Sequence, residues 1–304
     1  MTADSQKNTI TVLMSTYNGE KYLTEQIDSI ISQKDVNVNL LVRDDGSTDK
    51  TLAILREYQE KGALTFYTGD NLGPQRSFLH LLQHAPQCDY YAFADQDDVW
   101  LEDKLYSGIK EICSYDNQPA LYTCQTQMTN QQLERIPTPQ LHPCCTFGES
   151  LVYAYASGCT MVFNHALRTV ITAYQPSFID MHDWWIISIA TAMKAHVVFD
   201  HNAHILYRQH SRNVKGLNDT KFKEWKQRIQ RLLHKQQIRY HSALELYKGY
   251  YTLFPQESKD LIDLFIMSKK SFKHRLRLLM DSRYKCGDKK TWVLFKLSVL
   301  LNTY

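Results

Sequence analysis

The sequence lacks the short motifs that mark several common classes of nucleotide-binding and hydrolytic enzyme. Its 304 residues contain neither G-x-G-x-x-G nor G-x-x-x-x-G-K-[ST]. The usual nicotinamide enzymes and the P-loop nucleotidases therefore lose support. A G-x-S-x-G nucleophile turn is also absent, which weighs against the common serine hydrolases.

The cysteines weigh against a zinc-binding protein, and the apolar runs weigh against a membrane-spanning one. The seven cysteines include no C-x-x-C pair, and Cys144 is adjacent to Cys145, so we expect seven reduced thiols and no zinc knuckle. The apolar stretch 292–301 is interrupted by Lys296 and is too short to span a bilayer as a helix. Residues 1–8 are short and polar, unlike a signal peptide. We therefore expect a cytoplasmic protein.

Charge is distributed unevenly along the chain. Residues 1–220 carry 16 Lys and Arg against 25 Asp and Glu, whereas residues 221–304 carry 19 against 7. A basic end on an acidic body predicts an anionic contact, such as lipid headgroups or nucleic acid. A solvated helical face is the alternative. The chain is also rich in aromatic residues, with 19 Tyr and 5 Trp, and core packing is a simpler explanation of these than sugar binding.

The first hundred residues alternate between strand and helix patterns. This order predicts an α/β fold with a mostly parallel central sheet and helices on both faces. The middle of the chain predicts further strands and one helix, and the chain from about residue 220 reads as helical. Strands are expected at 10–17, 38–43, 64–67, 89–94, 120–128, 151–163, 197–199 and 205–207, and helices at 20–33, 48–58, 73–84 and 181–194.

Polar clusters follow three of these strands, at 15–18, 44–47 and 95–98. In parallel α/β sheets, ligands bind beyond the carboxyl ends of the strands. Asp95 and Asp97 suit a hard divalent cation, Mn²⁺ or Mg²⁺, that bridges to phosphate oxygens. We assign Asp97 as the metal ligand with Asp95 as its support, and Asp98 as a cap of the next helix.

Two later motifs offer catalytic groups. Asp183, in His182-Asp183-Trp184-Trp185, is a candidate general base for an acceptor hydroxyl, and its aromatic neighbours offer ring faces to a sugar. A helix cap with core tryptophans is the alternative. Arg208 and His210 follow a short strand and offer a diphosphate contact, a metal ligand or both, and Arg212 offers a further cation.

These pieces together resemble the family 2 glycosyltransferases, which have the nucleotide-diphospho-sugar transferase (GT-A) fold. The similarity covers about 10–215 and lies closest to the bacterial rhamnosyltransferase-like branch. The matching pieces are S-T-Y-N-G at 15–19, D-D-G-S-x-D at 44–49, N-x-G at 71–73, F-A-D-Q-D-D-V-W at 93–100, S-G-C-T at 157–160, H-D-W-W at 182–185 and Y-R-Q-H-x-x-N at 207–213.

The resemblance implies a role for each matching residue. Asp183 is the expected base of an inverting transfer, and a metal is expected at Asp95, Asp97 and His210. Gly158, Trp184 and Trp185 are expected to contact the acceptor. The residues expected to bind the nucleotide-sugar are Thr16, Tyr17, Asn18, Asp45, Asp95, Gln96, Arg208 and His210.

The resemblance also implies substrates and partners. The donor is expected to be dTDP-L-rhamnose, with UDP-linked glucose, galactose or N-acetylhexosamine as the alternative. The acceptor is a glycan or lipid-linked saccharide of a surface polysaccharide, and no nucleic-acid partner is expected. A non-catalytic glycan-binding protein is the alternative from another class. A nucleotidyltransferase is disfavoured, because 17–20 lacks a basic glycine-rich loop.

We expect a catalytic domain over 1–215 and a basic helical region over 216–304. Within that region, Phe272, Leu276 and Leu279 fall on one helical face, with Lys273, Arg275 and Arg277 around it. Such a helix is suited to the headgroup layer of an anionic membrane, which would place the protein at the inner face of the cell membrane. Packing on the catalytic domain or on a dimer partner is the alternative.

Overall fold

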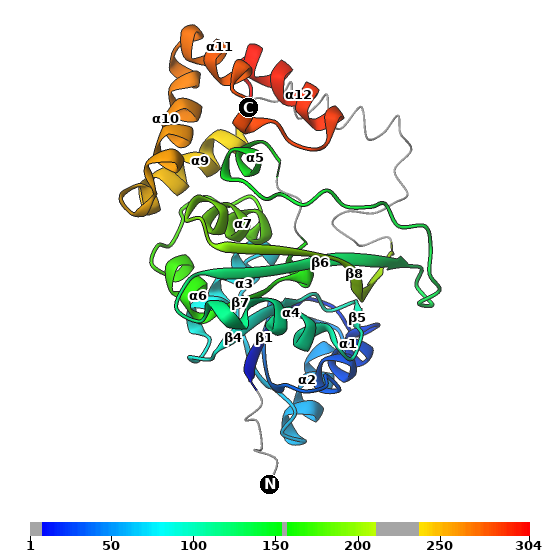
Figure 1. The fold of residues 1–304 in the computed structure, drawn as a ribbon. Helices are drawn as coiled ribbons and strands as arrows, with labels where there is room; N and C mark the ends of the chain where they lie inside the picture. The colour runs from blue at the N-terminus through cyan, green and yellow to red at the C-terminus, as the bar shows by residue number, and fades with distance from the viewer. Residues whose placement is uncertain (1–7, 154–156, 211–236) are drawn as a thin grey trace. The chain divides into compact units, whose positions relative to one another are not determined.

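The structure is a computed structural model that describes residues 8–153, 157–210 and 237–304 (Figure 1). The chain forms two compact units. The sheet unit comprises Met1–Gln140, Ser157–Thr172 and His196–Arg208. The helical unit comprises Leu141–Ala156, Ala173–Ala195 and Gln209–Tyr304. These units differ from the predicted division at residue 215, because two segments before that point pack with the C-terminal helices.

The sheet unit contains one eight-stranded sheet with the order β3-β2-β1-β4-β7-β6-β8-β5. The strands β3, β2, β1 and β4 run parallel, β6 also runs parallel to β8, and the other pairs are antiparallel. The strand bounds are β1 Thr9–Thr16, β2 Asn37–Asp44, β3 Thr65–Thr68, β4 Tyr90–Ala94, β5 Val99–Trp100, β6 Ala120–Thr129, β7 Val162–Asn164 and β8 His196–Arg208.

Helices cover both faces of this sheet, as predicted. Alternate residues of a strand point to opposite faces, so Val12 packs with the core of α1, α2 and α4, whereas Phe93 meets Phe78 of α3 at 5.3 Å between ring centroids. Helix α6 packs beside α3. The helix bounds are α1 Leu23–Ile31, α2 Thr51–Glu60, α3 Pro74–His84, α4 Lys104–Ile112 and α6 His165–Thr172.

The described part of the helical unit is built around two aromatic clusters. Trp185 packs against Tyr174 and Tyr250, and Phe265 packs against Phe295 and its neighbours. No helix in the described ranges is long and apolar enough to cross a bilayer. The bounds are α5 Phe147–Val152, α7 His182–Ala192, α9 Ile238–Tyr250, α10 Gln256–Lys270, α11 Phe272–Met280 and α12 Lys289–Leu300.

One prediction of secondary structure is wrong, and two predicted strands are joined into one. The strands expected over 151–163 are in fact the end of α5, a 3-10 turn at Gly158–Thr160 and the short β7. Helix α5 is buried almost all round, so it shows no amphipathic stripe, although Thr146 and Glu149 form a helix-start signal that would have revealed it. The two short strands expected at 197–199 and 205–207 are confirmed as strand, and both belong to the single strand β8.

Candidate active site

Strands β1 and β2 end side by side, and hydrogen bonds join the loops that follow them. The Thr16 hydroxyl donates to Asp44 Oδ2 at 2.9 Å, and Asp44 Oδ1 accepts from the Ser47 amide at 2.8 Å. Asn18, which has a positive φ of 48°, donates its amide to the Ser47 hydroxyl and accepts from the Thr48 amide, both at 2.9 Å. The predicted residues Thr16 and Asn18 thus shape this strand edge.

Asp45 is buried beside Arg43. The Arg43 guanidinium forms an ion pair with the Asp45 carboxylate, whose Oδ2 also accepts from the Leu72 amide at 3.1 Å. Tyr17, which follows the neighbouring strand β1, is 49% exposed. Contact of Asp45 with a nucleoside therefore stays a prediction, and Tyr17 offers the open aromatic surface.

Residues 95–98, which follow β4, form an acidic loop, and Gln96 connects this loop to the end of β1. Its Oε1 accepts from the Tyr17 amide at 2.9 Å, and its Nε2 donates to the Tyr17 carbonyl at 3.1 Å. Gly19 lies against this amide, because a Cβ there would stand 2.3 Å from Gln96 Oε1. Gln96 therefore sets the distance between two of the three predicted polar strand ends.

The acidic loop contains a compact group of ligand atoms. One atom each from Asp95, Asp98 and Cys159 lies within 4.8 Å of the others. Asp98 is fully buried: its Oδ1 accepts from the Arg208 amide at 3.1 Å, and the Cys159 thiol is a further hydrogen-bonding neighbour of its carboxyl group. Because a thiol is a weak donor, the buried carboxylate keeps a large desolvation cost, which a cation would offset.

The electrostatics of this group also suit a divalent cation. Burial raises the pKa of the Asp98 carboxyl well above its usual range, and repulsion from Asp97 and Asp95 adds to the shift. Burial likewise raises the pKa of the Cys159 thiol, so the thiol stays protonated. Hard cations such as Mg²⁺ and Mn²⁺ prefer oxygen ligands, and Asp95 with Asp98 provides them.

This group corrects the predicted role of Asp98. Helix α4 begins at Lys104 with Asp103 at its N-cap position, so Asp98 is too early in the chain to cap it. The compact group contains Asp98 and Cys159, whereas the prediction had named Asp97 and His210. Sequence reasoning missed Cys159, although S-G-C-T at 157–160 was one of the matching pieces.

The buried side chain of Arg208 holds the acidic loop in place through hydrogen bonds. Its side chain is buried, its Nε donates to the Asp97 carbonyl at 2.9 Å, and its NH1 donates to the Gln131 carbonyl at 2.6 Å. Its NH2 pairs with Glu25. These contacts engage every guanidinium nitrogen, so we correct the prediction of a diphosphate contact: Arg208 positions the loop.

Asp183 lies in the first turn of α7, in the helical unit, and is partly exposed. Its Oδ1 accepts from the Trp184 amide at 2.6 Å. Met181, and not Asp183, is at the N-cap position of this helix. A carboxylate in the first turn lies where the helix dipole favours negative charge.

The two tryptophans after Asp183 differ in their surroundings. Trp184 is partly exposed, and its indole donates to the Ser150 carbonyl at 2.9 Å. Trp185 is fully buried between Tyr174 and Tyr250. Trp185 has no ring face open to an acceptor, which corrects the prediction for this residue, and Trp184 remains a candidate.

Three other predicted residues are Gly158, His210 and Arg212. Gly158 is buried at the start of a 3-10 turn, next to Cys159. His210 is partly buried and belongs to the helical unit. Arg212 lies outside the described residues.

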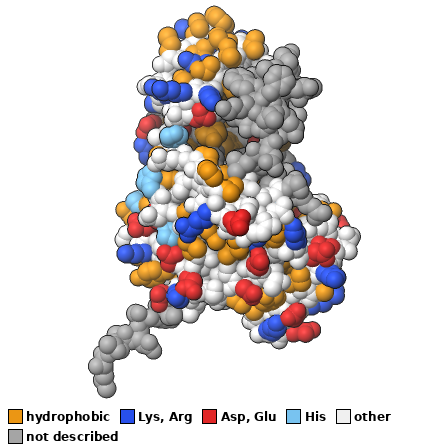
Figure 2. All heavy atoms as spheres, turned by 90° about the vertical axis from the view of Figure 1, so that its right-hand side faces the viewer, with side chains coloured by type: hydrophobic (Ala, Val, Ile, Leu, Met, Phe, Trp, Pro, Cys, Tyr) orange, Lys and Arg blue, Asp and Glu red, His pale blue; other side chains and the backbone are white. Residues whose placement is uncertain are grey.

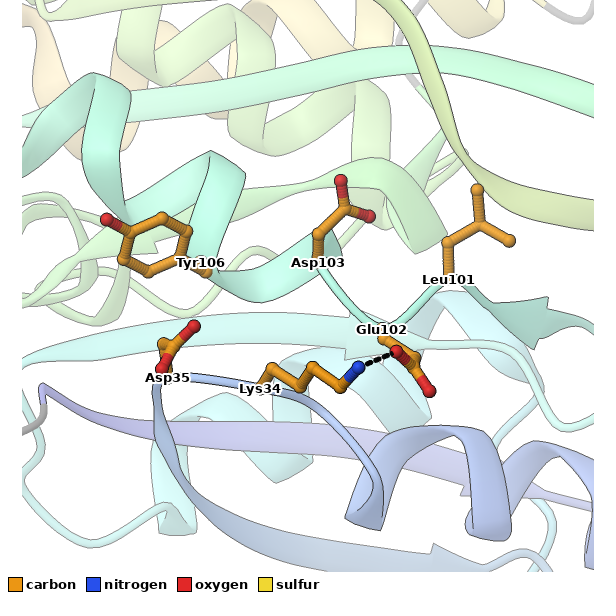
Figure 3. Close-up of a pocket in the computed structure, with 6 residues that line it drawn as sticks. All are labelled: Lys34, Asp35, Leu101, Glu102, Asp103 and Tyr106. Carbon is orange, nitrogen blue, oxygen red and sulfur yellow. Dashed lines mark ion pairs between the residues drawn. The ribbon is translucent and has the colours of Figure 1, made fainter.

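A cavity of about 480 Å³ lies elsewhere in the sheet unit (Figure 3). Its walls come from the loop before β2 and the loop before α4, where Lys34 pairs with Glu102. It therefore adjoins the amino end of β2, opposite the edge at which Asp44 lies, and it contains none of the predicted site residues. Its lining residues are Lys34, Asp35, Leu101, Glu102, Asp103 and Tyr106.

Comparison with known proteins identifies the family. The model of "Glycosyl transferase family 2" matches residues 11–170, which is more than half of the chain. The chain belongs to glycosyl transferase family 2. This glycosyltransferase is 29% identical over 224 residues to "dTDP-rhamnosyl transferase RfbG" of Shigella flexneri, covering 67% of this chain and 74% of the relative. It is 24% identical over 209 residues to an uncharacterized glycosyltransferase of Rickettsia typhi, covering 66% and 64%.

Solved structures show the same fold. A mannosyltransferase from Pyrobaculum calidifontis, in complex with GDP-Man and Mn²⁺, matches with a TM-score of 0.57 at 17% identity, covering 99% of this glycosyltransferase and 82% of that chain. S. aureus TarS 1–349 in complex with UDP-GlcNAc matches with a TM-score of 0.54 at 19% identity, covering 97% and 93%. The GT-A fold and the family are thus confirmed, and the relatives support the rhamnosyltransferase-like branch.

Proposed function

We propose that this glycosyltransferase moves a hexose, L-rhamnose from dTDP-L-rhamnose, to a hydroxyl of a growing bacterial surface polysaccharide. The observation that carries this proposal is the similarity to a dTDP-rhamnosyl transferase over two thirds of the chain. The ordered edge formed by Thr16, Tyr17 and Gln96 supports a nucleotide-sugar site there. Its position beyond the carboxyl ends of β1, β2 and β4 is typical of such sites.

The proposed reaction is a single displacement with inversion. Asp183 takes the proton of the acceptor hydroxyl as the oxygen attacks the anomeric carbon, and the nucleoside diphosphate leaves from the opposite side. The partly exposed carboxylate of Asp183 and the partly exposed ring of Trp184 support this assignment. The anomeric configuration of the product, determined by NMR, tests it: retention would contradict single displacement.

We further propose that Asp95 and Asp98 hold Mn²⁺ or Mg²⁺, with Asp97 and His210 as further ligands. The burial of the Asp98 carboxylate close to Asp95 supports this assignment. The cation would neutralise the charge that develops on the departing diphosphate. Arg208 holds the loop that carries these carboxylates in place.

A thermal-shift panel tests the donor. The full chain is heated with dTDP-L-rhamnose, UDP-glucose, UDP-galactose and UDP-N-acetylglucosamine, each with and without Mn²⁺. A ligand at about 100 times its Kd stabilises the folded protein by about 2.7 kcal/mol. We expect the largest shift from dTDP-L-rhamnose with Mn²⁺. A larger shift from a UDP-sugar would replace the proposed donor with the alternative.

Nucleotide release separates an enzyme from a binding protein. With the stabilising donor and a glycan acceptor, an enzyme releases free nucleoside diphosphate in proportion to time and protein. A protein that shows a thermal shift but no release with any lipid-linked or free glycan acceptor would instead be a non-catalytic glycan-binding protein. We place the working enzyme at the cytoplasmic face of the cell membrane, where a lipid-linked saccharide would serve as acceptor.

A further inference from the structure

Helix α11 exposes a stripe of large apolar side chains. Phe272, Leu276 and Met280 recur at every fourth position, so they share one face of the helix. All three are exposed, and Met280 is the most open, at 79%. Leu279, which the sequence had placed on this stripe, is half-buried. The stripe therefore ends at Met280, the last residue of α11.

Helix α12, which packs next to α11, exposes a second stripe. Its members recur at intervals of three and four residues, and Leu301, just after the helix, is 63% exposed. The opposite side of α12 is buried, because Phe295 and Val299 pack in the core of the helical unit. The exposed residues of this second stripe are Val293, Leu297, Leu300 and Leu301.

Positive charge surrounds both stripes. Residues 269–301 contain ten Lys and Arg against two acidic residues. Both acidic residues have local roles: Asp281 pairs with Arg283, and Asp288 caps α12 by accepting from the Lys290 amide at 2.9 Å. Figure 2 shows apolar side chains gathered at the top of the view, with Lys and Arg side chains beside them, at the level where Figure 1 draws α11 and α12.

We propose that α11 and α12 together form a docking surface for an anionic lipid bilayer, with both apolar stripes entering the headgroup layer. Apolar side chains flanked by Lys and Arg are the pattern of helices that lie in a membrane interface. Residues 269–301 contain only these two acidic groups, which fits a negatively charged partner better than a second copy of the same basic face. The sequence alone pointed to α11, and the structure adds α12.

Vesicle co-sedimentation of the full chain tests this surface without donor or acceptor. The vesicles contain phosphatidylcholine alone, or phosphatidylcholine with phosphatidylglycerol. We expect the protein to pellet with the anionic vesicles and to be released only in part by salt, because the apolar stripes still hold it. Because no sugar transfer is measured, this outcome is independent of whether the proposed donor is correct.

Two triple variants separate the apolar and the charged contributions. The apolar variant is Phe272→Gln, Met280→Gln and Leu297→Gln, and the charge variant is Lys273→Gln, Arg277→Gln and Lys289→Gln. Each Lys or Arg near an anionic surface strengthens binding about fivefold, so the charge variant should lower the partition coefficient about a hundredfold. The apolar variant should abolish the binding that persists at high salt.

Matched control variants alter other exposed surfaces. The apolar control is Ile31→Gln, Tyr106→Gln and Leu253→Gln, and the charge control is Arg56→Gln, Lys61→Gln and Lys110→Gln; all of these side chains are exposed. Both controls should pellet like the unaltered protein. Melting temperatures of all variants show that they remain folded.

Three results would overturn the proposal. One is equal pelleting of the unaltered protein and both test variants. Another is binding that does not depend on phosphatidylglycerol. The third is a light-scattering mass of two chains that falls to one in the apolar variant, with no vesicle binding, since α11 and α12 would then be a contact between copies.

Discussion

Asp183 is the residue on which the proposed chemistry depends most directly. Asp183→Asn keeps the shape of the side chain and removes its ability to accept a proton. General-base catalysis contributes about 10²–10⁴-fold, so we expect kcat to fall by that factor while the donor still raises the melting temperature. Asp180→Asn, an exposed carboxylate in the same segment, should leave kcat unchanged. Near-normal turnover of Asp183→Asn would refute the assignment.

Burial of the Asp98 carboxylate destabilises the folded protein, and the same carboxylate is a proposed metal ligand. Its raised pKa means that ionisation of the buried carboxyl opposes folding when no cation is bound. Asp98→Asn should therefore raise the melting temperature of the metal-free protein and abolish the further stabilisation that Mn²⁺ provides. Asp35→Asn, on an exposed turn, serves as the control. An unchanged response to Mn²⁺ would show that Asp98 is not a ligand.

His182 predicts a pH dependence of stability. Burial lowers the pKa of its imidazole to about 3, whereas the unfolded chain has a pKa of about 6.5. The unfolded state therefore binds more protons between these values, and stability falls as the pH drops below about 6.5, by up to about 1.4 kcal/mol per pH unit. Denaturant unfolding at several pH values should show a shallower decline for His182→Gln. Identical slopes would contradict the prediction.

Among the elements, α5 shows how close packing constrains a single position. A Cβ on Gly148 would stand 2.3 Å from the carbonyl oxygen of Arg283, and a backbone atom cannot move aside cheaply. Overpacking of this kind costs about 1–3 kcal/mol, so Gly148→Ala should lower the denaturation midpoint. Gly287→Ala, whose Cβ would meet His142 at an ordinary 3.5 Å, is the control. Equal midpoints would mean that α5 and the Arg283 turn shift freely.

The pairing of β5 with β8 explains the form of the acidic loop. The two strands are antiparallel, with Val99 opposite Leu206 and Trp100 opposite Ile205. Continued by two residues, this register places Arg208 opposite Asp97, which accounts for the bonds from Arg208 to the Asp97 carbonyl and the Asp98 carboxylate. Arg208 is therefore important because of its place in the sheet, and not because of an exposed charge.

At the scale of the whole molecule, metal removal should act on binding and on turnover together. In EDTA we expect the donor-induced thermal shift and nucleotide release both to disappear, and both to return when Mn²⁺ is added in excess. The reason is that the acidic loop repels a diphosphate unless a cation lies between them. Full activity in EDTA would remove the cation from the proposed mechanism.

The order of strands and helices over the first hundred residues, and the polar groups that follow β1, β2 and β4, could be predicted from the amino-acid sequence. Both are local properties: apolar periodicity identifies an element, and parallel strands bring their carboxyl ends to one edge. The positions of Thr16, Tyr17 and Gln96 at this edge were predictable for this reason. Helix α5 was missed, because burial on nearly all sides leaves no periodic pattern.

The burial of carboxylates next to one another and the enclosure of aromatic rings could be seen only in the folded protein. Asp98 meets Cys159 and Arg208 through the pairing of strands far apart in the chain, and Trp185 is enclosed by Tyr174 and Tyr250 from other segments of the helical unit. Burial and electrostatic repulsion depend on these long-range neighbours. No local motif specifies them, so the roles of Asp98, Arg208 and Trp185 required the fold.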